Sequence, residues 1–86
     1  MILNLRGNLI KYKNKRSLLT PTQTKLLLLL SDNEWHTVDD IAKYMGYKHT
    51  NSILYNINNI IDRGNVEIYR IRYLGYRLNT KVLIDY

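Results

Sequence analysis

The chain has 86 residues, enough for one small domain and too few for a deep cleft between domains. Its 45% hydrophobic and 23% charged residues are typical of a folded protein, and the absence of cysteine excludes disulfides, thiolate metal sites and a cysteine nucleophile. Thirteen Lys and Arg against seven Asp and Glu give a formal net charge of +6, which favours polyanionic partners such as nucleic acid.

The first 19 residues predict short antiparallel strands. Apolar stretches at 2–5 and 8–12 are separated by Arg6 and Gly7, and a third strand is expected at 17–19 after a polar turn. The apolar stretch before Arg6 is too short for a signal peptide, and no run is long enough to span a membrane. We therefore expect a cytoplasmic protein with no membrane partner.

The next segment has the pattern of a helix start. Thr20 is suited to the N-cap, Pro21 to the first helical position, and Gln23 to the position that closes a capping box. This predicts a first helix over 21–31.

Two further helices are expected over 38–45 and 51–63. Thr37 and Asp40 can form a second capping box, and Gly46 is suited to a left-handed cap. Thr50 is a candidate cap for the third helix, and Gly64 a stop signal.

Beyond the helices, apolar and polar residues alternate with a period of two over 66–72, and a second strand-like stretch follows at 76–78 after Gly75. This predicts a hairpin over about 66–80. Strands, three helices and a hairpin in this order describe an α+β winged helix-turn-helix: three helices, a short N-terminal antiparallel sheet and a C-terminal hairpin called the wing. We expect a single domain over 1–86.

The third helix carries the candidate base-reading side chains. A helical wheel places its isoleucines inward and puts amides and a tyrosine on the opposite face: Asn51, Tyr55, Asn58 and Asn59. Asparagine amides pair with adenine in the major groove. The alternative is that these residues only reflect an AT-rich genome, such as that of a phage or mobile element.

Arginines in the hairpin are candidate DNA contacts. Arg70 and Arg72 share one face of the strand, and Arg77 follows the turn, so their guanidinium groups are expected to converge near the tip. Arginine suits phosphates and the narrow minor groove of AT-rich DNA. The alternative is an ordinary solvent-facing role. Further candidate phosphate contacts are Lys15, Arg16, Lys48, His49 and Thr50.

No catalytic or metal-binding pattern is present in the sequence. His36 and His49 are the only histidines, and neither stands at ligand spacing with another candidate ligand. There is also no glycine-rich phosphate loop. We expect no enzyme activity, no cofactor and no metal.

Taken in order, these motifs resemble the winged-helix DNA-binding domain of OmpR/PhoB-type response regulators. Residues 19–23, Leu-Thr-Pro-Thr-Gln, are similar to the start of that family's first helix, and residues 71–78, Ile-Arg-Tyr-Leu-Gly-Tyr-Arg-Leu, are similar to its wing. The resemblance covers most of the chain. It implies that the major-groove positions are Tyr55, Asn58, Asn59 and Ile61, that Arg72 enters the minor groove, and that Arg70 lies near the backbone.

The chain departs from the family pattern in several places. Asn58, Asn59 and Ile61 stand where basic residues are usual, and Tyr73 replaces the first wing glycine. The resemblance would also imply a receiver domain with a phosphorylation switch, which we expect this protein to lack, so that its regulation is of another kind. The link at 47–49 is shorter than the loop with which many members touch RNA polymerase.

These observations predict a transcription regulator that binds double-stranded, AT-rich DNA as a homodimer or in tandem. One alternative is a protein-interaction module that contacts RNA polymerase or another regulator. A second is a replication or partition protein. Residues 81–86 are open to two interpretations, a closing strand or a partner-binding tail.

Overall fold

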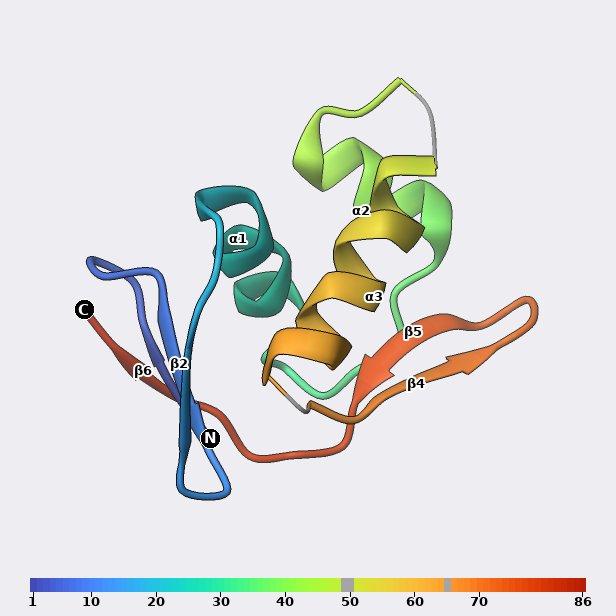
Figure 1. Ribbon diagram of the computed structural model, residues 1–86. Helices are drawn as coiled ribbons and strands as arrows, with labels where there is room; N and C mark the ends of the chain where they lie inside the picture. The colour runs from blue at the N-terminus through green and yellow to red at the C-terminus, as the bar shows by residue number, and fades with distance from the viewer. Residues whose placement is uncertain (49–50, 65) are drawn as a thin grey trace.

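The computed structural model describes residues 1–48, 51–64 and 66–86. Three strands lead into three helices, which are followed by a hairpin and a last strand (Figure 1). In chain order the elements are β1 (Ile2–Asn4), β2 (Leu9–Tyr12), β3 (Lys15–Leu18), α1 (Pro21–Leu30), α2 (Val38–Met45), α3 (Asn51–Gly64), β4 (Ile68–Ile71), β5 (Gly75–Leu78) and β6 (Leu83–Asp85). Each helix begins and ends within one residue of its predicted bounds.

The N-terminal sheet has four strands in the order β3-β2-β1-β6. Strands β1, β2 and β3 pair antiparallel, whereas β6 lies parallel to β1. The amide N–H of Leu83 donates to the carbonyl of Met1, and that of Leu5 donates to the carbonyl of Asp85. The last residues are therefore a closing strand, and the sheet is mixed where a purely antiparallel one was expected.

The turn between β2 and β3 is tighter than the sequence indicated. Lys13 and Asn14 have φ of 50° and 62°, the left-handed pair of a two-residue hairpin turn. Tyr12 then pairs directly with Lys15. The prediction of a polar turn through Arg16 is wrong, because Lys15 and Arg16 are already strand residues of β3.

The helix ends follow the capping chemistry with two differences. Thr20 and Gln23 form the full capping box of α1, but at α2 the structure shows only one half, a bond from the Asp40 N–H to Thr37 Oγ1 at 3.1 Å. Aspartate is one methylene shorter than the glutamate of a full box. Gly64 is the last residue of α3 and not a left-handed cap, and it lies against Val66. The expected cap Thr50 lies outside the described residues.

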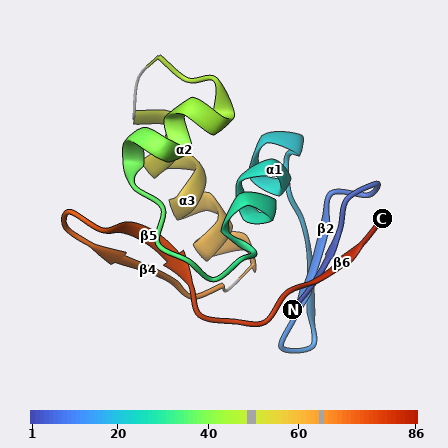
Figure 2. The same ribbon diagram turned by 180° about the vertical axis from the view of Figure 1, so that it is seen from behind.

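The core lies between the inner face of the sheet and the three helices. Figures 1 and 2 show α1 and α3 on one side of the sheet and the β4–β5 hairpin at the far end of the molecule. The fully buried side chains come from every layer, namely Leu3, Ile10, Leu26, Leu27, Leu30, Ile41, Ile53, Ile57, Ile60, Val66 and Leu78. No helix in the described parts of the chain is both long and apolar enough to cross a bilayer.

A buried amide holds α3 at a fixed position on α1. Asn56 accepts from Gln23 Nε2 at 3.5 Å and donates from Nδ2 to the Ser52 carbonyl at 2.9 Å and to the Tyr47 hydroxyl at 3.4 Å. Both amide side chains are buried. Because a buried amide is costly without partners, this bond favours one register of the two helices.

The hairpin is attached to the chain just before α2. The N–H of His36 donates to the Tyr76 carbonyl at 3.0 Å, and the N–H of Tyr76 donates to the His36 carbonyl at 2.9 Å. Gly75 permits this approach, because a Cβ built on it would lie 1.9 Å from the His36 carbonyl oxygen. The hairpin therefore extends from a rigid base.

Candidate nucleic-acid interface

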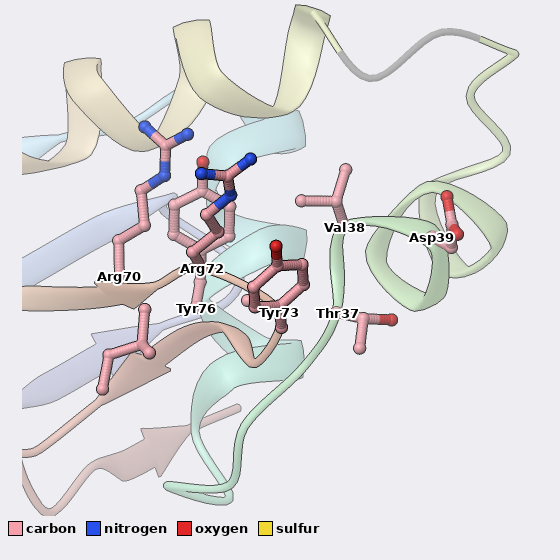
Figure 3. Close-up of a pocket in the computed structure, with 9 residues that line it drawn as sticks. Thr37, Val38, Asp39, Arg70, Arg72, Tyr73 and Tyr76 are labelled. Carbon is pink, nitrogen blue, oxygen red and sulfur yellow. The ribbon is translucent and has the colours of Figure 1, made fainter.

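The pairing register of the hairpin separates its side chains into two faces. Arg70 stands opposite Tyr76, and Tyr69 stands opposite Arg77. Since neighbouring residues of a strand point to opposite faces, Arg70 and Arg77 lie on different sides. Figure 3 shows the side chains of Arg70, Arg72 and Tyr76 pointing from the hairpin toward α3.

A groove of about 260 Å³ lies between this face and the start of α2. Its walls are Thr37, Val38 and Asp39 on one side and residues 70–73, 75 and 76 on the other. A second hollow of about 130 Å³ adjoins it and is lined by Asn51 and Leu54 of α3 together with Val38, Arg70 and Tyr76. Three shared residues join the hollows, so the groove runs from the hairpin tip to the start of α3.

The two guanidinium groups beside the groove have no carboxylate partner. Among the described residues the ion pairs are Lys13–Glu67 and His36–Asp32, and neither involves the hairpin arginines. Arg70 lies 5.9 Å from the ring centre of Tyr76, and Arg72 lies 5.4 Å from that of Tyr73. Stacking orders these side chains without neutralising them. The groove therefore presents two free positive charges to an anion.

The outer face of α3 is open and uncharged over most of its length. Asn51, Tyr55 and Asn58 are exposed and follow helical spacing along one line. Asn59 is half-buried, and its Nδ2 donates to the Tyr55 carbonyl at 2.9 Å. That bond uses one of the two amide hydrogens and leaves the other hydrogen and Oδ1 free to pair with an adenine edge.

Ile61 is half-buried and packs against the core. It lines a hollow with Lys13, Val66 and Ile68 at the start of the hairpin. Burial of this side chain stabilises the protein through its apolar area, and it leaves only part of Ile61 open to a partner.

Arg77 does not join the other hairpin arginines, and the prediction that the three guanidinium groups converge is wrong. Its register places it on the opposite face, where its guanidinium lies 6.0 Å from the ring centre of Trp35. The side chain is half-buried, and its Nε has no hydrogen-bond partner among the described residues. Arg77 is in position to pack the hairpin onto the loop before α2.

The other candidate phosphate contacts are widely separated. Lys15 and Arg16 are exposed on β3, an edge strand of the sheet, and both views place the sheet at the opposite end of the molecule from the hairpin tip. Lys48 is exposed shortly before α3. His49 and Thr50 lie outside the described residues. A ligand that fills the groove therefore lies nearer to Lys48 than to β3.

The candidate contacts named from the sequence did not include the start of α2 or Leu54. Thr37, Val38 and Asp39 line the groove, and Leu54 of α3, which is 41% exposed, lines the adjoining hollow. The capping pattern at Thr37 predicted where α2 begins. A cap does not indicate which segments lie next to the helix end, so the approach of the hairpin to the start of α2 was not predicted.

An ion pair supports the loop to which the hairpin is attached. His36 Nε2 lies 2.9 Å from both carboxylate oxygens of Asp32, and the Glu34 N–H donates to Asp32 Oδ1 at 2.9 Å. Partial burial raises the pKa of Asp32, but the bonds from Glu34 and His36 outweigh it and hold the pKa below its ordinary value of 3.8. The charged carboxylate therefore stabilises this loop.

Comparison with solved structures identifies the architecture. The C-terminal domain of the nisin resistance regulator NsrR, a lantibiotic response regulator, superposes with a TM-score of 0.73 at 20% identity over 85% of each chain. The DNA-binding domain of E. coli CadC superposes with a TM-score of 0.68 at 18% identity, over 85% of this chain and 79% of that one. The chain has the fold of these two domains, a winged helix.

In that winged helix, β4–β5 is the wing and α3 is the third of the three helices, so the predicted fold class is confirmed. No protein-family model matches the sequence, and no curated protein matches it either. The likeness is therefore carried by the order and packing of the elements, and the residues of the interface must be argued from their own geometry.

Proposed function

We propose that this winged helix binds double-stranded DNA as a transcription regulator, with α3 in the major groove and the wing on the adjacent minor groove or backbone. The observation that carries the proposal is the groove that runs from the wing past the start of α2 to the start of α3, on a scaffold shared with DNA-binding domains. Its two arginines have no carboxylate partner among the described residues. A phosphate backbone has the charge and the linear shape that such a groove accepts.

Base recognition is assigned to the outer face of α3. Asn51, Tyr55 and Asn58 are exposed side chains with donors, acceptors or a ring for base edges, and Asn59 contributes the amide hydrogen and oxygen that its bond to Tyr55 leaves free. Asparagine favours adenine, and arginine favours the narrow minor groove of A-tracts. We therefore propose an AT-rich site.

Affinity is assigned mainly to the wing, since no Lys or Arg lies on the exposed line of α3 made by Asn51, Tyr55 and Asn58. Arg70 and Arg72 supply the phosphate or minor-groove contacts, and Lys48 supplies a further one at the start of α3. Arg77 acts indirectly, by fixing the wing against Trp35.

One module of this size covers a short stretch of DNA, so we propose that two copies bind adjacent half-sites. A second candidate function, contact with RNA polymerase or another regulator, is favoured by the outer face of the sheet. Ile2, Leu18 and Leu83 are exposed there, and Leu18 is 68% exposed. The two functions use opposite ends of the molecule and are compatible.

The test is equilibrium binding of labelled AT-rich duplexes as a function of salt concentration. For the wild type, the logarithm of the binding constant should fall linearly with the logarithm of the salt concentration. The double variant Arg70→Ala/Arg72→Ala should reduce the magnitude of this slope by about two, roughly one per phosphate contact. Arg6→Ala/Lys11→Ala is the matched control, because it also removes two positive charges. Arg6 is exposed in the turn between β1 and β2, and Lys11 is exposed on β2. Both views place this sheet at the opposite end of the molecule from the wing tip, so this variant should retain most of the affinity.

An unchanged salt dependence in the double variant would show that Arg70 and Arg72 do not contact the DNA backbone. Binding that is insensitive to salt, or limited to a protein partner, would favour the second candidate function.

A further inference from the structure

The tip of the wing carries a side chain that the fold does not explain. Ile71 pairs with Gly75, and the N–H of Leu74 donates to the Ile71 carbonyl at 3.1 Å, so the loop consists of Arg72, Tyr73 and Leu74. Tyr73 is 87% exposed, more than any other large hydrophobic residue of the described segments. Leu74 beside it is 45% exposed.

The backbone at this position is also unfavourable for a tyrosine. Tyr73 has φ of 74°, a left-handed conformation that glycine adopts freely and a bulky side chain does not. Neither burial nor a hydrogen bond from its hydroxyl group offsets this cost in the described residues. A strained and fully presented aromatic ring at a loop tip is a feature that a ligand can explain.

We infer that Tyr73 is a wedge that inserts its ring between neighbouring base pairs in the minor groove and bends the duplex. This inference rests on the proposed DNA binding. Apolar side chains inserted at a base step unstack it and kink DNA, and an aromatic ring offers a face on which a base can stack. The ligand class is duplex DNA with an easily opened pyrimidine–purine step under the wing tip.

Neighbouring groups suit this role. The Arg72 guanidinium lies 5.4 Å from the ring centre of Tyr73, where it orders the ring and can also reach a phosphate or the groove floor. Figure 3 shows Tyr73 beside Arg72 on the side of the wing that carries Arg70. The hydrogen bonds between His36 and Tyr76 anchor the wing, so a force at the tip is resisted by the core. Leu74 adds a second apolar surface next to the opened step.

The experiment measures DNA bending by energy transfer between dyes at the two ends of a duplex that contains one central TA step. A parallel duplex carries 2-aminopurine at that step, whose fluorescence rises when the base is unstacked. Tyr73→Gly removes the ring and suits the local φ, and Tyr73→Asn keeps a side chain that tolerates the left-handed region. The matched control is Tyr69→Ala, which removes another exposed tyrosine of the same hairpin away from the tip.

The wild type and Tyr69→Ala should bend the duplex by about 20° or more and raise the 2-aminopurine signal. Both Tyr73 variants should still bind with salt-dependent affinity, yet lose most of the bend, the fluorescence change and the preference for a TA step over an AA step. Unchanged bending in the Tyr73 variants, or tight binding by the wild type without bending, would overturn the wedge and leave DNA binding intact. An absence of any duplex binding would overturn the wedge and the proposed function together.

Discussion

Replacement of Gly75 by alanine tests how the wing is held on the core. A Cβ at this position would lie 1.9 Å from the His36 oxygen and 2.7 Å from the Thr37 Cα, both backbone atoms that cannot rotate away. The loop and the wing must separate, which breaks the two hydrogen bonds between His36 and Tyr76. Alanine must also adopt the φ of 97° at Gly75 or distort the turn.

The cost can be estimated from these terms. Two backbone hydrogen bonds contribute about 0.5–1.5 kcal/mol each, and the left-handed backbone costs alanine about 1–2 kcal/mol. The sum is roughly 2–5 kcal/mol. A chain of 86 residues has a free energy of unfolding of about 4–13 kcal/mol at the usual value per residue, so the change removes a large share of it.

Gly46→Ala provides the matched control. Gly46 has φ of 73°, but a Cβ there meets nothing within 4 Å. Only the cost of the left-handed backbone applies, which lowers the free energy of unfolding by about 1–2 kcal/mol. The stiffer unfolded chain of the alanine variant offsets a small part of this loss. Chemical denaturation followed by circular dichroism measures both variants, and the denaturant midpoint should fall clearly further for Gly75→Ala. Equal losses in the two variants would refute the close contact between wing and loop.

Three further outcomes follow from the structure. Asn56→Ala leaves Gln23 without its partner across α1 and α3, and should lower the free energy of unfolding by about 1–3 kcal/mol in the same denaturation assay; a neutral result would contradict that bond. The folded-state pKa of Asp32 is depressed, so the stability it contributes is fully present well above its ordinary value of 3.8 and is lost as pH falls through the lower folded-state pKa. A thermal-melting series from pH 6 to 2 should show a weaker acid dependence for Asp32→Asn, and parallel curves for the two proteins would argue against this role of Asp32. Tyr73→Gly relieves an unfavourable φ and should leave the melting temperature unchanged or higher, whereas a clear loss would mean that Tyr73 stabilises the fold.

The helices and the wing were predicted well because their start, end and type depend on residues that are close together in the sequence. Thr20, Pro21 and Gln23 determine the start of α1 through bonds within one turn, and the alternation from residue 66 onward reports a strand directly. The left-handed cap at Gly46 is likewise a property of one residue. These features require no knowledge of distant parts of the chain.

The features that the sequence did not predict depend on contacts between distant segments. The parallel pairing of β6 with β1 joins the two ends of the chain, and no pattern within residues 81–86 identifies that partner. The face occupied by Arg77 depends on the register opposite Tyr69 and on the position of Trp35. Three predicted contacts, Arg70, Arg72 and Asn51, do line the groove, since alternation in a strand and helical spacing both indicate a face.

The measurement that most directly tests DNA readout by this winged helix is selection of bound duplexes from a random library at a fixed salt concentration. It is carried out with the wild type, with Arg70→Ala/Arg72→Ala and with Asn58→Ala. We expect an AT-rich motif with the wild type, little recovery with the wing variant, and relaxed preference at particular bases with the α3 variant. Failure of the wild type to enrich any sequence would contradict specific DNA recognition by α3 and the wing.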